Sequence, residues 1–405
     1  MSANRAMHTI RPLVPRVYLP TFLASFGEGM LIPTLPLYLA SLGVNYTLVT
    51  LAVAMMGFGT LAANVPTGLL LTRISERRAM IAGVVLFAAG GLLLAVAPFF
   101  ALILVVRAVA GVGAALWGIS RMAYMVRTVP IEHRGRAMSF FGGINRIAVF
   151  MSPAIGGALA TVSFQLAFLV AGLVMAAAVL PVLVVEERLG PPVRYGGRQP
   201  GWREIVDVFR HHTRDLLTAG LGLVFTAMIR SGRQVVVPLF AADTIGLDAA
   251  AVGVAVSASA AVDMTLFPVA GYLMDRWGRR FAIVPSFLIF GLAMGVLPLA
   301  RDFTGLLIVT MLIGLGNGIG SGTMLTMGSD LAPQDNPGAF LGVWRLIGDS
   351  GHTAGTLVVG AVSDLIGLAM APFFLAAIGL AGALTFGVLV RETLVKPEPA
   401  VLDSA

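Results

Sequence analysis

The stretch that decides the fold is a cluster of charges between two apolar runs, Gly271-Tyr272-Leu273-Met274-Asp275-Arg276-Trp277-Gly278-Arg279-Arg280. A related stretch lies 203 residues earlier, at Gly68-Leu69-Leu70-Leu71-Thr72-Arg73-Ile74-Ser75-Glu76-Arg77-Arg78. The earlier copy ends an apolar run that begins near Tyr46, and the later copy ends one that begins near Ala249. A charged segment used twice, half a chain apart, indicates a duplicated membrane protein.

The composition places most of the chain in lipid. Of 405 residues, 58% are hydrophobic and 12% are charged, and the mean hydropathy is +0.91. A bilayer core about 30 Å thick calls for about 20 apolar residues per helix. Twelve such runs are expected, near residues 17–40, 46–71, 79–98, 101–125, 138–160, 165–185, 216–241, 249–273, 281–299, 304–327, 339–362 and 367–390. The predicted fold is therefore an all-α membrane protein.

The repetition extends beyond the charged segment. Leu35-Pro36-Leu37-Tyr38 in the first run matches Val237-Pro238-Leu239-Phe240 in the seventh, and Gly143-x-x-Arg146 matches Gly342-x-x-Arg345. We therefore predict two pseudo-symmetric six-helix bundles, residues 1–185 and 216–405, joined by a polar cytoplasmic linker at 186–215. Parallel repeats of this kind are typical of transporters that rock around a site at the bilayer midplane.

The basic residues gather on one side of the predicted topology. The outer turns hold one of them, Arg301, and the inner segments hold those near both chain ends, in the linker and in the two charged stretches. By the positive-inside rule both termini are cytoplasmic in a plasma membrane of the bacterial inner-membrane type. No solvated basic face remains for nucleic acid. The absence of cysteine excludes disulfides and thiolate metal sites, and the first run lacks a cleavage site, so we expect it to stay as a helix.

These motifs, in this order, resemble the major facilitator superfamily over essentially the whole chain. The stretch from Gly271 to Arg280 is similar to that family's signature between spans 8 and 9, and Arg107-Ala108-Val109-Ala110-Gly111-Val112-Gly113 to its span 4 motif. Ser152-Pro153 resembles the start of the span 5 motif of antiporters, with serine in place of the usual glycine. Residues 32–43 are most similar to drug:proton exporters. The resemblance implies alternating access between two six-helix halves and makes Arg107 a candidate for proton transfer.

The charged segments are predicted to form a cytoplasmic gate. Asp275 can attract the positive end of an adjacent helix, whereas the first copy has Thr72 at that position and Ser75 where the family has glycine. The lock should therefore rest mainly on Asp275. The expected gate residues are Gly68, Arg73, Arg146, Gly271, Asp275, Arg276, Arg279, Arg280 and Arg345.

Charged side chains at bilayer depth tend to face a cavity or a partner, because exposure to lipid costs about 2.5–3.5 kcal/mol at a helix centre. Glu28 and Asp263 are expected near the midplane, and Arg230 matches Glu28 in the repeat register. Breaking and making a carboxylate–arginine contact changes the proton affinity of the carboxylate. Glu28 and Asp263 are therefore candidates for proton or cation coupling, and the alternative is a static ion pair that fixes helix packing.

The other charged positions within the predicted spans leave two alternatives open as well. Arg345, Asp349 and His352 share one helix face, as an internally neutralised patch or as a relay that uses the histidine. Buried arginines outnumber buried acids, so Arg230, Arg233 and Gln234 are candidates for binding a carboxylate or phosphate group. Glu28 and Asp263 equally suit a cationic compound.

We expect a monomeric secondary transporter that exports a small organic compound against proton entry. The alternatives are a proton-coupled symporter or a uniporter of an organic anion, and, more distantly, an intramembrane enzyme or a receptor. An enzyme is disfavoured because one in-span histidine without cysteine offers no nucleophile–base pair or metal site. The expected partners are the lipid bilayer and a small-molecule substrate, with no cofactor and the proton gradient as the energy source.

Overall fold

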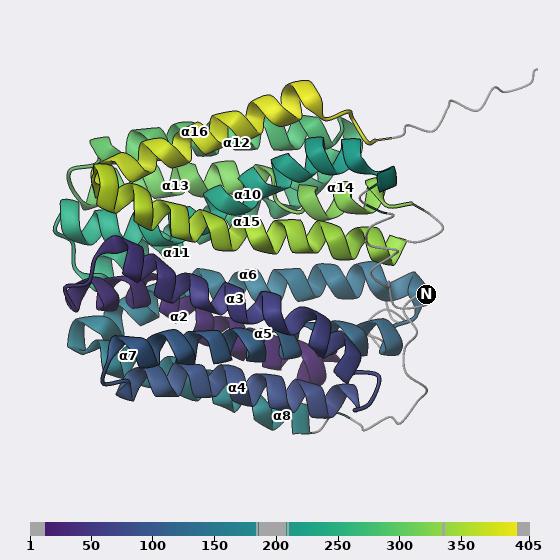
Figure 1. The fold of residues 1–405 in the computed structure, drawn as a ribbon, viewed down its shortest axis with the longest axis horizontal. Coiled ribbons are helices and arrows are strands. Elements are labelled where there is room, and N and C mark those ends of the chain that lie inside the picture. The colour runs from purple at the N-terminus through teal and green to yellow at the C-terminus, as the bar shows by residue number, and fades with distance from the viewer. Residues whose placement is uncertain (1–12, 184, 186–207, 209, 334–336, 395–405) are drawn as a thin grey trace, which may run out of the picture.

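The computed structural model describes residues 13–183, 185, 208, 210–333 and 337–394, and within them it is helical with no β-strand (Figure 1). The predicted linker at 186–215 lies mostly outside these residues. The first half comprises α2 (Leu19–Ser41), α3 (Tyr46–Leu70), α4 (Glu76–Val96), α5 (Phe100–Thr128), α6 (Ile131–Val162), α7 (Phe164–Ala177) and α8 (Val179–Leu183). The second comprises α10 (Thr213–Leu239), α11 (Ala249–Arg276), α12 (Arg279–Val296), α13 (Phe303–Ile319), α14 (Thr323–Leu331), α15 (Pro337–Ile366) and α16 (Ala371–Leu384).

Eleven segments within the described residues are long and apolar enough to cross a membrane. They correspond to eleven of the twelve predicted spans. The twelfth, α15, is 30 residues long but carries Arg345, Asp349 and His352 in its middle, and it is not among the eleven. The all-α membrane fold expected from the composition is confirmed.

Helix starts follow from side-chain caps. Asn45 accepts a hydrogen bond from the backbone of Leu48 at the start of α3, and Asp248 accepts one from Ala251 at the start of α11. Such caps satisfy backbone N–H groups that have no partner within the helix. The two caps stand at equivalent positions of the repeat, so the duplication includes the signals that begin the helices.

The same packing recurs in both halves at an offset of 203 residues. A Cβ on Gly111 would collide with the carbonyl of Met56, and a Cβ on Gly314 with the carbonyl of Ser259. These glycines allow α5 to approach α3, and α13 to approach α11, at backbone distance. The repeat read from the sequence is therefore a repeat of helix–helix contacts.

The predicted span at 304–327 is not one helix. It is broken into α13 and α14 by a turn at 320–322, where Gly322 has φ of +82°. Gly314, Gly318 and Gly322 recur every four residues, a spacing that predicts one packing face on a continuous helix. Gly314 and Gly318 do pack against α11, but Gly322 supplies the left-handed backbone that ends the break, a conformation that glycine adopts without steric cost.

The halves lie one above the other in Figure 1, and they meet through α6 with α11 and α3 with α15. At the face opposite the basic loops the contacts are close: the backbone N–H groups of Tyr46 and Thr47 donate to Asp364 at 2.9 and 2.8 Å. There, too, a Cβ on Gly253 would meet Pro153 and Gly157 of the other half. We call this the closed face.

The basic face, which holds the turns at 71–75 and 277–278, is less tightly joined. A Cβ built on Gly142, Gly271 or Gly342 has no neighbouring atom within 4 Å. Gly68, the first-copy equivalent of Gly271, has the same open space. The two bundles therefore pack closely at one end only.

Candidate functional site

A cavity of about 270 Å³ lies between the halves, bounded by α2, α3, α5, α10 and α15. Its walls are largely apolar, and Leu31, Ile32, Leu35 and Val53 are among the lining residues. Five of the predicted site residues contribute its charged and polar groups, namely Glu28, Arg107, Gln234, Asp349 and His352. A mostly apolar concave site with a few convergent polar groups is the usual form of a small-molecule site.

Glu28 projects into this cavity from the middle of α2. Among the described residues no hydrogen bond or ion pair reaches its carboxylate. Arg230, its expected partner from the repeat register, instead donates to the carbonyl of Gly320 at 3.3 Å. The predicted Glu28–Arg230 contact is thus not formed in this conformation.

Asp263, the second candidate for coupling, has two direct partners. Arg146 Nη1 lies 2.5 Å from its Oδ2, and Asn317 Nδ2 donates to its Oδ1 at 2.9 Å. Arg146 also contacts the hydroxyl of Ser321. Because α6 belongs to the first half and α11 to the second, the Arg146–Asp263 pair joins the two bundles.

The broken helix explains where two of the arginines point. A break at membrane depth frees backbone groups that need polar partners. Arg230 satisfies the carbonyl of Gly320 at the break, and Arg146 binds the adjacent Ser321. These two arginines therefore stabilise the turn between α13 and α14.

Asp349 has two direct partners, of which one is charged. Arg345 Nε lies 3.6 Å from its Oδ2 on the same helix, and Asn64 of the first half donates to the same oxygen at 3.1 Å. The i,i+4 ion pair is the one that the spacing predicts. His352 lines the cavity beside it, and no bond between Asp349 and the imidazole is present in the described part of the chain.

Arg107 is buried, lines the cavity and donates to the thioether of Met56 at 3.1 Å. The alternative to a role in proton transfer is a structural one, in which the arginine binds backbone carbonyls of a neighbouring helix. Within the described residues its side chain has no carbonyl partner, and its Nε is buried without a hydrogen bond.

Arg121 is a charged residue of this region that the sequence reading missed. It donates to Thr21 at 3.2 Å and lies over the rings of Trp117 and Phe141, 4.9 and 4.5 Å from their centroids. Such cation–π contacts shield a guanidinium from lipid. The available signal was its position within the predicted span 101–125, with Trp117 one turn before it.

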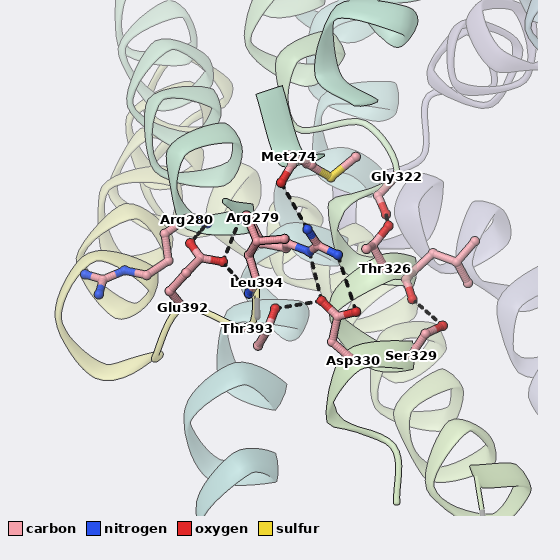
Figure 2. Close-up of polar contacts among 11 residues, drawn as sticks. Met274, Arg279, Arg280, Gly322, Thr326, Ser329, Asp330, Glu392, Thr393 and Leu394 are labelled. Carbon is pink, nitrogen blue, oxygen red and sulfur yellow. Dashed lines mark hydrogen bonds and ion pairs between the residues drawn. The ribbon is translucent and has the colours of Figure 1, made fainter. Parts of the chain in front are cut away.

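The predicted gate residues of the second charged stretch bind within their own half (Figure 2). Arg279 Nε donates to Asp330 at 2.8 Å and its Nη1 to the carbonyl of Met274 at 3.0 Å. Arg280 binds the carbonyl of Gly387. No contact with the first half is made by these arginines in the described residues.

Glu392, which follows the last helix, completes this cluster (Figure 2). Its carboxylate accepts from the backbone N–H groups of Arg279 at 2.8 Å and Arg280 at 3.0 Å. Gly278, at φ of +112°, has no side chain to cap α12, and a Cβ there would collide with Glu392. The carboxylate therefore caps α12 from outside the helix.

The charged residues that remain among the gate candidates are exposed, whereas Gly68 and Gly271 are partly buried. Asp275 has no hydrogen bond or ion pair within the described residues, and Arg73 and Arg345 are exposed as well. Arg276 lies over the ring of Tyr272, 5.9 Å from its centroid. Thr72, at the position equivalent to Asp275, donates back to the carbonyl of Leu69. The role of Asp275 as a lock stays a prediction for another conformation.

Two repeat-related helical bundles around a central cavity that holds a few charged groups are typical of alternating-access transporters. The chain belongs to the Major Facilitator Superfamily, whose profile matches residues 17–356 and, in a second match, residues 219–403. It is accordingly a multi-pass membrane transporter and not an enzyme.

Among curated relatives, the quinolone resistance protein NorA of Staphylococcus aureus (strain COL) is 21% identical over 355 residues, which is 86% of this chain and 89% of that protein. Multidrug resistance protein 1 of Bacillus subtilis (strain 168) is 21% identical over 364 residues, 89% of this chain and 91% of that protein. A solved D-xylose-proton symporter has a TM-score of 0.71 at 15% identity, covering 96% of this chain and 98% of its own. Its likeness concerns the fold.

Proposed function

We propose that this transporter exports a small organic compound in exchange for protons, with Glu28 as the proton-carrying group. The observation that carries the proposal is the position of Glu28, whose carboxylate faces the central cavity without a direct protein partner. A group that binds and releases protons in each cycle must be reachable from the cavity. Asp263 is not among the residues that line this cavity, and in this conformation its carboxylate is bound directly by Arg146 and Asn317.

The direction of transport is proposed from the resemblance to resistance proteins. NorA and multidrug resistance protein 1 are named for resistance, and export is the transport direction that confers it. If the basic face is cytoplasmic, as the positive-inside rule predicts, the close contacts at Asp364 seal the outer side. The present conformation would then be the inward-facing one, ready to load cargo and release a proton to the cytoplasm. We further propose a monomer in the plasma membrane, energised by the proton gradient.

A proton-coupled symporter or a uniporter of an organic anion is the second candidate. It is favoured by the excess of arginine over acid within the predicted spans. Six arginines lie in these spans, at positions 107, 121, 146, 230, 233 and 345, with three acids, Glu28, Asp263 and Asp349.

Transport into everted vesicles with an imposed proton gradient tests the proposal. A panel of cationic, neutral and anionic compounds is added, and proton movement is followed with a pH-sensitive dye, with and without a protonophore. Export by exchange predicts that a cargo compound enters the vesicles while protons leave. Glu28→Gln should abolish this proton flux, whereas Glu28→Asp, which keeps a titratable group, should retain part of it.

The control is Asp263→Asn. This variant removes the contact with Arg146, and we expect altered rates with proton coupling retained. Full substrate-driven proton flux in Glu28→Gln would show that Glu28 is not the proton carrier. Cargo that enters everted vesicles without any proton movement would instead favour a uniporter.

A further inference from the structure

Arg233 lies in the wall of a compartment beside the central cavity. It lines a second, smaller cavity of about 60 Å³ between α2, α6, α10, α11 and α13. Ile32 and Gln234 line both this cavity and the larger one that contains Glu28. The small cavity is therefore a side compartment of the central site.

Among the described residues, the guanidinium of Arg233 makes no hydrogen bond or ion pair with a carboxylate or a carbonyl group. Its recorded contact is with the ring of Phe290, 5.3 Å from the centroid. The two neighbouring arginines do have such partners. Arg230 donates to the carbonyl of Gly320, and Arg146 forms an ion pair with Asp263. Asp263 is close enough to attract Arg233 electrostatically, but the direct partners of its carboxylate are Arg146 and Asn317. A guanidinium at bilayer depth without a directly bound anion is costly, and the cost is relieved when an anion binds.

The size and chemistry of the side compartment suit one small acidic group. Ser259 and Thr310 contribute hydroxyls to its wall, and Val149, Val237, Val256 and Ile313 make the rest apolar. A whole drug-sized molecule needs a pocket of about 300 Å³ or more. The compartment is too small for such a molecule, whereas the adjoining cavity of about 270 Å³ can hold an organic body.

We propose that the cargo is an organic carboxylate, bound with its acid group on Arg233 in the side compartment and its apolar body in the central cavity. Guanidinium binds carboxylate through two parallel hydrogen bonds, which fixes orientation as well as charge. Gln234 lines both the side compartment and the central cavity. It therefore lies where the acid group would join the apolar body of the cargo. This assignment rests on the proposed function, because it names the cargo class of the same transport site.

Equilibrium binding tests the assignment without any proton gradient, so its outcome is independent of direction and coupling. The purified full-length transporter in lipid nanodiscs is titrated with a rhodamine carboxylate and with its methyl ester, and binding is followed by fluorescence polarisation. Aromatic carboxylic acids of graded size, each paired with its own ester, then compete with the bound dye. The wild-type protein should prefer acid to ester in at least one pair.

Arg233→Gln should weaken binding of the preferred acid by about 10- to 100-fold, the range for a lost hydrogen bond to a charged group, and leave the ester unchanged. Arg233→Lys keeps the positive charge without the forked geometry of the guanidinium. It should lose less affinity for the acid than Arg233→Gln does. Ala260→Val adds bulk to the wall of the compartment from α11 and leaves the arginine itself unchanged. By reducing the volume of the compartment, it should also weaken binding of the acid selectively.

Three results would overturn the assignment: no pair in which the acid binds better than its ester, an equal loss of acid and ester in Arg233→Gln, or unchanged acid affinity in that variant. If Arg233→Gln does not fold, Arg233→Lys and Ala260→Val decide, and unchanged acid preference in both overturns it. If the wild-type protein prefers acid to ester but shows no proton exchange in everted vesicles, the proposed proton coupling is rejected. The assignment of the carboxylate site to Arg233 then still stands.

Discussion

Two ion pairs at equivalent positions of the halves have their charges exchanged. Glu76 of α4 binds Arg127 of α5 at 3.1 Å, and at an offset of 203 residues Arg279 of α12 binds Asp330 of α14 at 2.8 Å. Glu76 of the first half stands at the position of Arg279 in the second half, and its partner Arg127, 51 residues later, stands at the position of Asp330. Each half keeps one acid and one base at this site, with the order reversed.

The exchange predicts a rescue. Arg127→Glu places two carboxylates together and should lower the thermal stability of the transporter. Adding Glu76→Arg restores an opposite-charge pair, in the order found in the second half, and should recover most of the loss. Contacting charges couple by about 0.5–3 kcal/mol, which a double-mutant cycle of melting temperatures can resolve. Additive losses in the double variant would show that the pair does not stabilise the fold.

At the scale of elements, composition and periodicity predicted the helices well, and the polar contacts between them poorly. The N-terminal ends at Asn45 and Asp248 follow from capping residues that are visible in the sequence. The break at Gly320–Gly322 lies in an apolar run, and glycine there is equally compatible with close packing. The partners of Arg146 and Arg230 depend on how each helix is rotated about its axis, which one sequence does not specify.

The cap on α12 predicts a pH dependence. Burial opposes ionisation of Glu392, but hydrogen bonds from the backbone of Leu394, Arg279 and Arg280 outweigh it, so its pKa lies below the ordinary value. Because the folded-state pKa is below the unfolded value of about 4.3, the carboxylate stabilises the fold above that pH. The stabilisation is lost as the pH falls through the lower, folded-state pKa.

Glu392→Gln should therefore lower stability at neutral pH by about 1 kcal/mol, the usual worth of a helix cap. The difference in melting temperature between wild type and variant should shrink as the pH falls below about 4.3. Thr393→Val, which removes a neighbouring hydrogen bond to Asp330 and no titratable group, is the matched control. A difference that is constant with pH would contradict the role of the carboxylate.

At the scale of the whole molecule, the two halves are held together at one face and separate at the other. Tyr46, Thr47 and Asp364 belong to different halves and bond directly at the closed face, whereas Gly142 and Gly342 have open space at the basic face. The duplicated bundles and the polar midplane could be predicted from the sequence. The sequence could not predict which face is closed in this conformation, because an alternating-access transporter must be able to close either face.

The natural absence of cysteine allows a direct measurement of this asymmetry. A cysteine pair at Thr47 and Asp364 should cross-link readily in the absence of cargo and arrest transport. A single cysteine at Gly342 should react with a membrane-impermeant maleimide added to the basic face, and cargo that promotes the opposite conformation should slow the reaction. Fast labelling at Gly342 together with no cross-link at the closed face would contradict the arrangement described.

The backbone contact of Gly253 with Pro153 and Gly157 has a mechanical consequence. At this contact the backbones of α6 and α11 meet directly, because Gly253 and Gly157 have no side chains to separate them. One helix can therefore rotate against the other at this point with little change in side-chain packing. A spanning helix of 20 residues is about 30 Å long, so a rotation of about 10° at this fulcrum moves the far ends by roughly 5 Å. The small residues near one end of the two helices thus fix the distance from the pivot to the far ends. A larger side chain at Gly253 would move the pivot toward the middle of the helices and reduce the displacement of the far ends.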